Sequence, residues 1–239
     1  MAAGVIAAHQ GVTVKFDGTP TSMTAEPMSQ ITGKYYRVTN AAKRCFDWRQ
    51  NLNVLDNGVA VAAANIEFID YLNGIVKFAA SYTVNGPVTV TGTYLPLTTL
   101  GVVKSFDSAF SPDLIDKSVF GNAHSRVNRG LCDYAIDLGQ FDHLESAAGV
   151  ETLEASLQAG TVRLISIECL QDGSTLANGG IVIRALVVLS SVSTDADPTK
   201  LVESGLKLDG SPTPSTNAAA AGPWPVSWIV LDGASGLYV

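Results

Sequence analysis

Between residues 53 and 96, apolar and polar positions alternate in short runs that are separated by turn-forming residues. The turn formers are Asp56-Asn57-Gly58, Asn73-Gly74 and Asn85-Gly86-Pro87. Asn and Gly accept the positive φ angles that tight hairpin turns require. The pattern therefore predicts a string of β-hairpins and an antiparallel sheet.

Two apolar runs, 161–170 and 180–192, predict the strongest strands of the chain. In the second run both faces are apolar, and Arg184 is its one charged residue. A strand that is apolar on both faces must be covered on both. We therefore expect a second layer on one side and a helix or a neighbouring subunit on the other. Shorter strands are predicted at 11–16, 35–39 and 201–208.

Residues 142–159 carry the signals of one α-helix. Asp142 and Glu145 have the spacing of a capping box, and Gly160 marks the end of the segment. The apolar residues on one helical face are Val150, Leu153 and Leu157. A helix near 143–159 that packs on a sheet is the expected result.

Residues 104–130 mix turn formers, charges and isolated apolar residues. This mixture predicts a long loop with one strand. Loops of this length in a compact domain are usually functional, and subunit contact is one such function.

Both ends of the chain predict extended arms. Residues 1–33 are small and polar and are interrupted by prolines, and residues 211–239 contain four prolines together with Trp224 and Trp228. Two tryptophans on an extended arm seldom stay in water, so this arm is expected to anchor on another surface, such as another subunit. Residues 34–210 form the expected β domain.

Charged residues make up 15% of the 239 residues, against a norm of about 25% for soluble domains. A monomer must solvate its whole surface, so this deficit favours a chain that hides part of its surface against other subunits. No apolar run suits a membrane span, and the N-terminus lacks the basic region of an export signal. The three cysteines are far apart and predict reduced, mostly buried side chains.

The net charge of −7 is unevenly distributed along the chain. Residues 34–49 contain five bases and one acid, whereas residues 107–154 contain nine acids and three bases. An acidic chain does not bind nucleic acid by counterion release, which argues against packaging or sequence-reading roles. The basic segment is either a solvated loop or a surface that docks on an acidic face of a neighbouring subunit.

Catalytic and metal-binding patterns were not found in the sequence. His9, His124 and His143 lie outside any nucleophile motif, and Asp195-x-Asp197 lacks the rest of a calcium loop. The acidic pairs Asp113/Asp116 and Glu151/Glu154 are more simply solvated or helix-start charges. We expect a protein that is not an enzyme and that has no cofactor or metal.

Two sequence runs and their order point to a family. The run PDLIDKSVFG occupies 112–121, RVNRGLCD follows at 126–133, and the predicted helix and two long strands come next. In this order they resemble the tail tube (major tail) proteins of long-tailed bacteriophages, which often carry a D-L-apolar-D-x-S/T-x-F-G run and then G-L-x-D. The chain differs from that pattern because no Trp precedes Arg126.

The resemblance implies two packed antiparallel sheets, as in a β-sandwich or barrel, with one flanking helix. It also implies six copies per ring, rings stacked head to tail, and a hollow tube in the virion tail of a phage without a contractile sheath. Assembly in the host cytoplasm and partners such as tape measure, terminator and tail tip proteins are implied as well. Double-stranded DNA would pass through without specific binding, since six copies would carry about −42 and repel phosphates.

Two alternatives remain open from the sequence. One is the inner tube of a contractile tail or injection device, and the other is a β-sandwich module that binds a carbohydrate or a receptor. For the tube interpretation, the candidate subunit-contact residues are Lys34, Arg37, Lys43, Arg44, Arg49, Asp113, Asp116, Arg126, Trp224 and Trp228.

Overall fold

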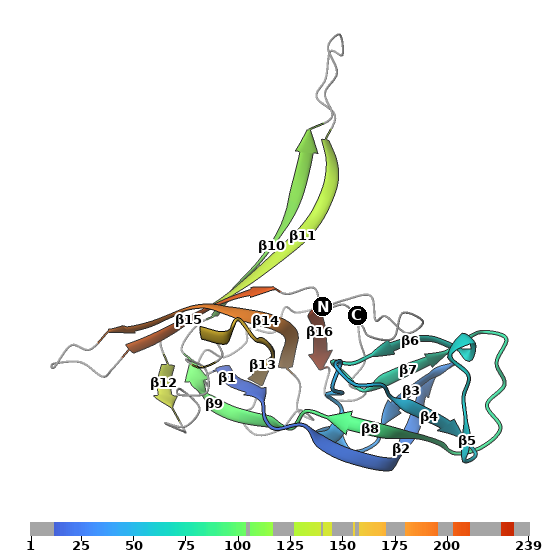
Figure 1. The fold of residues 1–239 in the computed structure, drawn as a ribbon. Coiled ribbons are helices and arrows are strands. Elements are labelled where there is room, and N and C mark those ends of the chain that lie inside the picture. Colours follow the sequence, from blue (N-terminus) through green and yellow to red (C-terminus); the bar gives the residue numbers. More distant parts are fainter. Residues whose placement is uncertain are drawn as a thin grey trace, which may run out of the picture. The chain divides into compact units, whose positions relative to one another are not determined.

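The chain is mainly β and forms two antiparallel sheets in a computed structural model (Figure 1). The structure describes residues 12–103, 106–116, 127–139, 141–144, 155, 158–170, 180–195, 203–210 and 226–231. The expected fold class, mainly β with antiparallel sheets, is therefore confirmed.

The chain divides into two compact units. The first unit contains residues 1–13, 100–163 and 187–211, and the second contains 14–99, 164–186 and 212–239. The predicted division at residues 33 and 210 follows sequence composition, and it stays a prediction.

One sheet has nine strands, in the order β10-β11-β15-β14-β13-β1-β9-β12, and β16 also pairs with β14. Its strands are β1 (Val12–Asp17), β9 (Leu97–Val103), β10 (Phe106–Asp116), β11 (Val127–Leu138), β12 (Phe141–Leu144), β13 (Val162–Leu170), β14 (Gly180–Asp195), β15 (Glu203–Gly210) and β16 (Val226–Leu231). The strands predicted at 11–16, 161–170, 180–192 and 201–208 correspond to β1, β13, β14 and β15.

The other sheet has seven strands, in the order β5-β4-β8-β2-β3-β7-β6, and belongs to the second unit. Its strands are β2 (Thr21–Thr32), β3 (Tyr35–Val38), β4 (Asn53–Asp56), β5 (Val59–Ala60), β6 (Ile66–Asp70), β7 (Ile75–Phe78) and β8 (Val88–Tyr94). Two short 3₁₀ helices, η1 (Ala41–Lys43) and η2 (Ala63–Asn65), lie between strands of this sheet.

Two of the three predicted turns form hairpins. Asn57 and Gly58, with φ of 50° and 78°, join β4 to β5 in a two-residue turn, and Gly74, with φ of 65°, ends the turn between β6 and β7. The third prediction, at Asn85-Gly86-Pro87, is wrong as a hairpin, because β8 pairs with β2 and β4 rather than with β7. Those residues belong to a longer connection.

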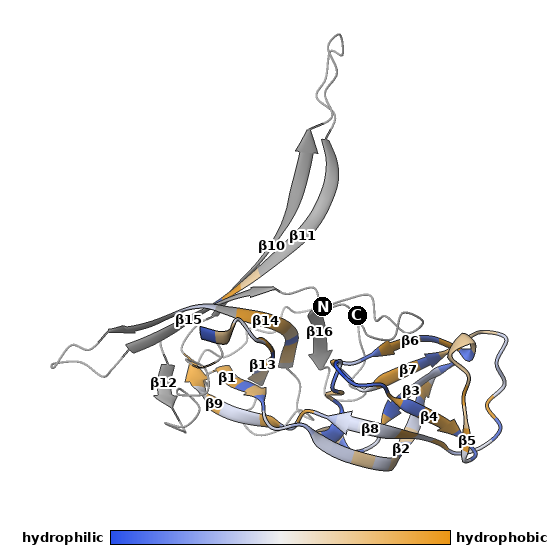
Figure 2. Cartoon of the chain, viewed as in Figure 1, coloured by the Kyte–Doolittle hydropathy of each residue, from blue (hydrophilic) through white to orange (hydrophobic). Residues whose placement is uncertain are grey.

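The core of the second unit contains residues of the seven-stranded sheet, of its connecting segments, and of the parts of β1, β13 and β14 that belong to this unit. Its largest fully buried side chains are Phe46, Phe78, Ile69, Leu95, Leu164, Ile165, Ile167, Ile183, Val14 and Val38. Figure 2 shows the apolar residues of β14 and of the β6–β7 hairpin. Residues 182–186 of β14 are buried on both faces within this one chain, so they do not need a neighbouring subunit to cover them.

Three segments differ from the sequence predictions. Residues 104–130 were expected to be mostly loop, but β10 and β11 form a long antiparallel hairpin. The capping box at Asp142 is wrong, since β12 pairs with β9 and places His143 opposite Val102. β2 was not expected, because a bulge between Met23 and Glu26 interrupts its alternation.

The predicted helix is confirmed only at its C-terminal end. Gln158 and Ala159 are helical, and Gly160 follows with a φ of 59°. This positive φ is the conformation that favours Gly just after a helix. Most of the segment between 145 and 157 lies outside the described residues.

Candidate subunit-contact surfaces

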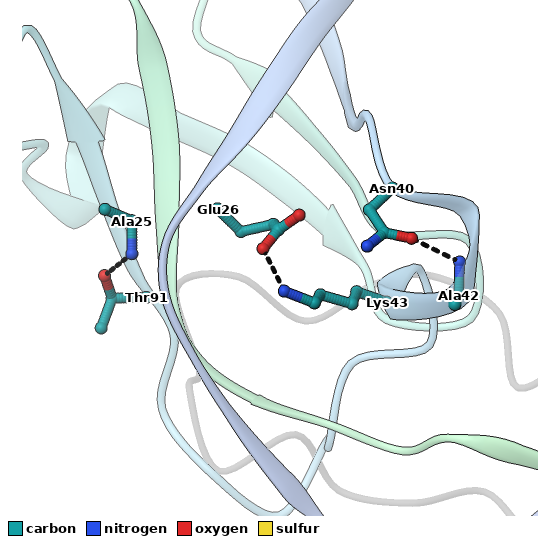
Figure 3. A network of polar contacts seen from close by, with 6 residues as sticks. All are labelled: Ala25, Glu26, Asn40, Ala42, Lys43 and Thr91. Atoms are coloured by element: carbon teal, nitrogen blue, oxygen red, sulfur yellow. Dashed lines mark hydrogen bonds and ion pairs between the residues drawn. The ribbon is translucent and has the colours of Figure 1, made fainter.

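The predicted basic segment, 34–49, lies in the second unit and includes β3 and η1. At its centre, Asn40 caps η1, because its Oδ1 accepts a hydrogen bond from the Ala42 N–H at 3.1 Å. Lys43, the last residue of η1, forms an ion pair with the buried Glu26 of β2 (Figure 3). The pair connects η1 to the strand beside it.

The bulge in β2 sets up this ion pair. Ala25 adopts a φ of 47°, and its N–H donates to Thr91 Oγ1 of β8 at 2.9 Å (Figure 3). A bulge shifts the alternation of a strand by one residue and so changes which side chains point inward. Here Glu26 is buried, and Lys43 provides its counter-charge.

Two other bases of the segment also have partners within the chain. Arg44 donates through Nε to the Val38 carbonyl at 3.0 Å and through Nη2 to the Thr39 carbonyl at 3.2 Å. Arg49 Nε donates to Asp47 Oδ1 at 2.7 Å, and its guanidinium lies 5.1 Å from the Trp48 ring centre.

Of the remaining two bases of the segment, Lys34 directly precedes β3 and Arg37 lies within it. Lys34 Nζ donates to the Tyr82 carbonyl at 2.6 Å, and Arg37, on β3, is partly exposed. Lys34, Lys43, Arg44 and Arg49 therefore help to hold the fold, a role that neither sequence interpretation of the segment included. Whether any of them also contacts a subunit stays a prediction.

Arg184 is a buried charged residue. In the sequence it stood out only as the one charged residue of an apolar strand, without a predicted role. It is 7% exposed, and its Nη1 donates to the Leu72 carbonyl at 2.9 Å and to Asn73 Oδ1 at 3.2 Å. Both acceptors lie in the β6–β7 turn, so one guanidinium connects β14 to that turn inside the second unit. A buried charge with such partners is costly to remove.

Asp70, the last residue of β6, also binds the residues of this turn. Its carboxylate accepts hydrogen bonds from the N–H of Leu72 at 3.0 Å and of Asn73 at 3.2 Å, and from Asn73 Nδ2 at 2.8 Å. Burial raises the pKa of the Asp70 carboxyl, and this effect outweighs the hydrogen bonds and the charge of Arg184, which lower it.

The segment 44–46 packs closely on this turn. Phe46 N–H donates to the Tyr71 carbonyl at 2.8 Å, and the Cys45 thiol donates to the Leu72 carbonyl at 3.6 Å. Burial raises the pKa of the Cys45 thiol. Cys45 and Cys169 are free thiols, as expected, and the Cys132 side chain lies outside the described residues.

Asp56 is a second carboxylate that holds a loop of the seven-stranded sheet. It accepts hydrogen bonds from the N–H groups of Asn85 and Gly86, both at 2.9 Å, and from the Tyr82 hydroxyl at 2.8 Å. Burial alone would raise the pKa of Asp56, but these hydrogen bonds outweigh it and hold the pKa below its ordinary value. Asp56 thereby fixes the connection that leads into β8.

The β10–β11 hairpin brings the two family-like sequence runs together. Pro112 pairs in register with Cys132, Leu114 with Arg129, and Asp116 with Val127, with a bulge between Pro112 and Leu114. Strand β15 pairs with β11 only over 135–138. We call the part beyond it, 110–116 with 127–134, the ribbon; among the described strands it has no third partner.

Of the other predicted contact residues, three lie on described strands and two do not. Asp113 and Asp116 lie on β10, and Trp228 lies on β16, where it pairs in register with Ile183. Arg126 and Trp224 lie outside the described residues.

Among the described residues, no group of His, Cys, Asp or Glu side chains is arranged to hold a metal ion. Nor does any helix there have the length and apolar character needed to cross a membrane.

No protein-family model matches the chain, and no curated protein matches it in sequence. Among solved structures, it is similar to a chain of the virion of a native gene transfer agent particle, with 11% identity and a TM-score of 0.38, over 49% of this chain and 85% of that one. A chain from the tail of an empty particle of this kind, determined with C6 symmetry, gives 10% identity and a TM-score of 0.37 over 49% and 84%. Similarity this low does not define a family.

Proposed function

We propose that this chain is a structural protein of a phage-type tail that associates with copies of itself into stacked, six-membered rings forming the tail tube. The observation that carries the proposal is the pairing of the two tail-tube-like runs on the ribbon. Residues 112–116 and 127–133 face each other across one hairpin, although ten undescribed residues separate β10 from β11 in the sequence. The two runs that carry the resemblance in sequence thus lie next to each other on the β10–β11 hairpin.

Among the described strands β10 pairs only with β11, and its other edge supports association through this element. A terminal strand presents a row of unpaired N–H and C=O groups that can pair with another chain. β10 has 11 residues, whereas the other described strands with a single partner, β12, β5, β6 and β16, have 4, 2, 5 and 6. In the proposed ring, β10 of one copy extends the sheet of the next.

Head-to-tail contacts of this kind use a different patch on each partner. Such contacts close into a ring when the rotation between copies allows it, and they form a filament when they stack along an axis. In the proposed tail, the tape measure, terminator and tail tip proteins would contact the tube, and a contractile sheath would be absent. The site of action would be the virion tail.

The proposed tube has no catalytic role and conducts double-stranded DNA without holding it. Its net charge of −7 per copy, or about −42 per ring of six, repels phosphates and keeps the residence time of DNA short. A ring structure with a channel lined mainly by Lys and Arg would contradict this part of the proposal.

Electron microscopy of the purified protein over a range of concentrations tests the proposal. We expect rings or hollow tubes to appear as the concentration rises. Charged side chains on an edge strand oppose edge pairing, so the double variant Asp113→Lys/Ile115→Lys should stay monomeric.

A matched control is Val59→Lys, which adds a charge at a 70% exposed position of β5 and should assemble like the unmodified chain. A chain that stays a clean monomer at every concentration would overturn the proposal. If the ribbon variant assembles as readily as the control, β10 does not mediate the association.

A further inference from the structure

The chain contains four Asn-Gly pairs. Asn178-Gly179 lies outside the described residues, and the structure places the other three pairs in three different environments. In an Asn-Gly pair the glycine nitrogen can attack the asparagine side-chain Cγ, and ammonia leaves as a cyclic succinimide forms. Water then opens the ring to aspartate or to isoaspartate. Glycine favours this attack because it lacks the Cβ that would hinder the approach of its nitrogen. The rate depends on whether the two atoms can meet in the correct orientation.

At Asn73-Gly74 the electrophile is held in place. Asn73 is 1% exposed, its Nδ2 donates to Asp70 Oδ2 at 2.8 Å, and its Oδ1 accepts from Arg184 Nη1 at 3.2 Å. The amide therefore cannot rotate toward the Gly74 nitrogen without breaking both contacts, and little water can reach it.

At Asn85-Gly86 the nucleophile is held instead. The Gly86 N–H donates to Asp56 Oδ1 at 2.9 Å, and this hydrogen bond holds the nitrogen at the carboxylate. The Asn85 amide also donates to the Thr83 carbonyl at 3.1 Å. Attack at this pair requires the loss of the Asp56 contact.

At Asn57-Gly58 we find, among the described residues, no hydrogen bond that holds the Asn57 side-chain amide, as at Asn73, or the Gly58 N–H, as at Gly86. Both residues are exposed, and they form the two-residue turn between β4 and β5. The ladder of this hairpin pairs Asp56 with Val59 and Leu55 with Ala60, so the Gly58 nitrogen lies outside it. The space around Gly58 is open, which leaves room for water.

From this contrast we infer that, among the three described pairs, Asn57 is the site that modifies itself in the folded chain, where the amide converts to aspartate and isoaspartate. Isoaspartate inserts one extra carbon into the backbone, which a two-residue turn cannot absorb without losing its register. The side chain of Asn57 also packs against Gly86, so the new carboxylate would lie near Asp56. The modification would therefore loosen the β4–β5 hairpin as the protein ages.

Peptide mapping by mass spectrometry, after incubation of the full chain in mildly alkaline buffer, tests the inference. We expect conversion at Asn57 to be at least about tenfold faster than at Asn73 or Asn85, because a poorly oriented attack loses rates of that order. In denaturant, where the contacts are absent, the three sites should convert at similar rates. Isoaspartate at Asn57 can be confirmed with an isoaspartyl methyltransferase label.

The variant Asp56→Ala provides a second readout. It frees the Gly86 N–H, so conversion at Asn85 should rise while Asn73 stays protected, and the protected Asn73 shows that the unit is still folded. The inference is overturned if Asn73 or Asn85 converts as fast as Asn57 in the folded chain. It is also overturned if Asn57 converts in denaturant but not in the folded chain.

Discussion

The seven-stranded sheet and the ribbon have the same antiparallel pairing, but they differ in how their polar groups are satisfied. In the sheet, Asp56, Asp70 and Arg184 hold the loops and turns with hydrogen bonds from inside the same chain. In the ribbon, β10 has a partner on one side only among the described strands. We therefore expect substitutions in the sheet to lower mainly the stability of the chain, and we propose that substitutions in the ribbon affect mainly its association with other copies.

The largest effect on stability is expected from Arg184→Ala. The change leaves Asn73 Oδ1 without its buried donor and removes the positive charge beside Asp70, at a cost of about 3 kcal/mol or more. Thermal and denaturant unfolding would measure it. Arg37→Ala, which removes a partly exposed charge on β3, should stay within about 0.5 kcal/mol. Equal losses for the two variants would contradict the role given to Arg184.

A smaller loss is expected from Gly74→Ala. Gly74 has a φ of 65°, and a Cβ there would lie 2.7 Å from the Arg44 carbonyl oxygen, so we expect a cost of about 2 kcal/mol. Gly33→Ala is the matched control, with a φ of 51° and open space around it, and should cost about 1 kcal/mol. The difference between the unfolding free energies of the two variants in denaturant measures the cost of the steric contact between a Cβ at residue 74 and the Arg44 backbone.

The next effect appears as a pH dependence. Because the pKa of Asp56 is lowered in the fold, its stabilisation is present above the ordinary carboxyl pKa and is lost as pH falls through the lowered value. The pKa of Asp70 is raised, so its contribution has the opposite sign, and stability falls as pH rises from the ordinary carboxyl pKa through the raised value.

Unfolding free energies measured over a series of acidic pH values would separate the two carboxylates. In the Asp56→Asn variant, the unfolding free energy should fall less steeply as the pH is lowered. In the Asp70→Asn variant, it should fall less steeply as the pH is raised toward neutrality. Parallel pH profiles for the two variants would mean that their environments are not different in the way described.

The smallest effect on stability is expected from the ribbon. Asp113→Lys/Ile115→Lys should change the unfolding free energy of the monomer by no more than about 0.5 kcal/mol, because a two-stranded ribbon without a third described partner strand contributes little stability by itself. Denaturant unfolding under dilute, monomeric conditions would measure it. A loss comparable to that of Arg184→Ala would show that the ribbon is part of the stable core.

The sequence predicted features that depend on a few neighbouring residues. The turn at Asn57 and Gly58 was predictable because positive φ angles select those residue types, and β14 was predictable because both of its faces are apolar. The bulge at Ala25 hid β2, because it interrupts the alternation that identifies a strand. Cross-strand pairing with β9 outweighed the local capping signal at Asp142.

The roles of the predicted contact residues depend on partners that are distant in sequence. Lys43 pairs with Glu26, and Lys34 donates to the carbonyl of Tyr82. A charge count cannot find such partners, so the basic segment looked like a free surface. The ribbon was missed for a related reason, because its apolar residues are sparse and its strands are defined by their pairing with each other.

Hydrogen exchange of the backbone amides, compared between dilute monomer and concentrated assembled protein, tests the central claim most directly. We expect new protection on β10 and on the edge strand of the next copy that pairs with it. The inner strands of the seven-stranded sheet should change little, because they already have partners on both sides. Assembled protein in which β10 exchanges as fast as in the monomer would contradict the claim.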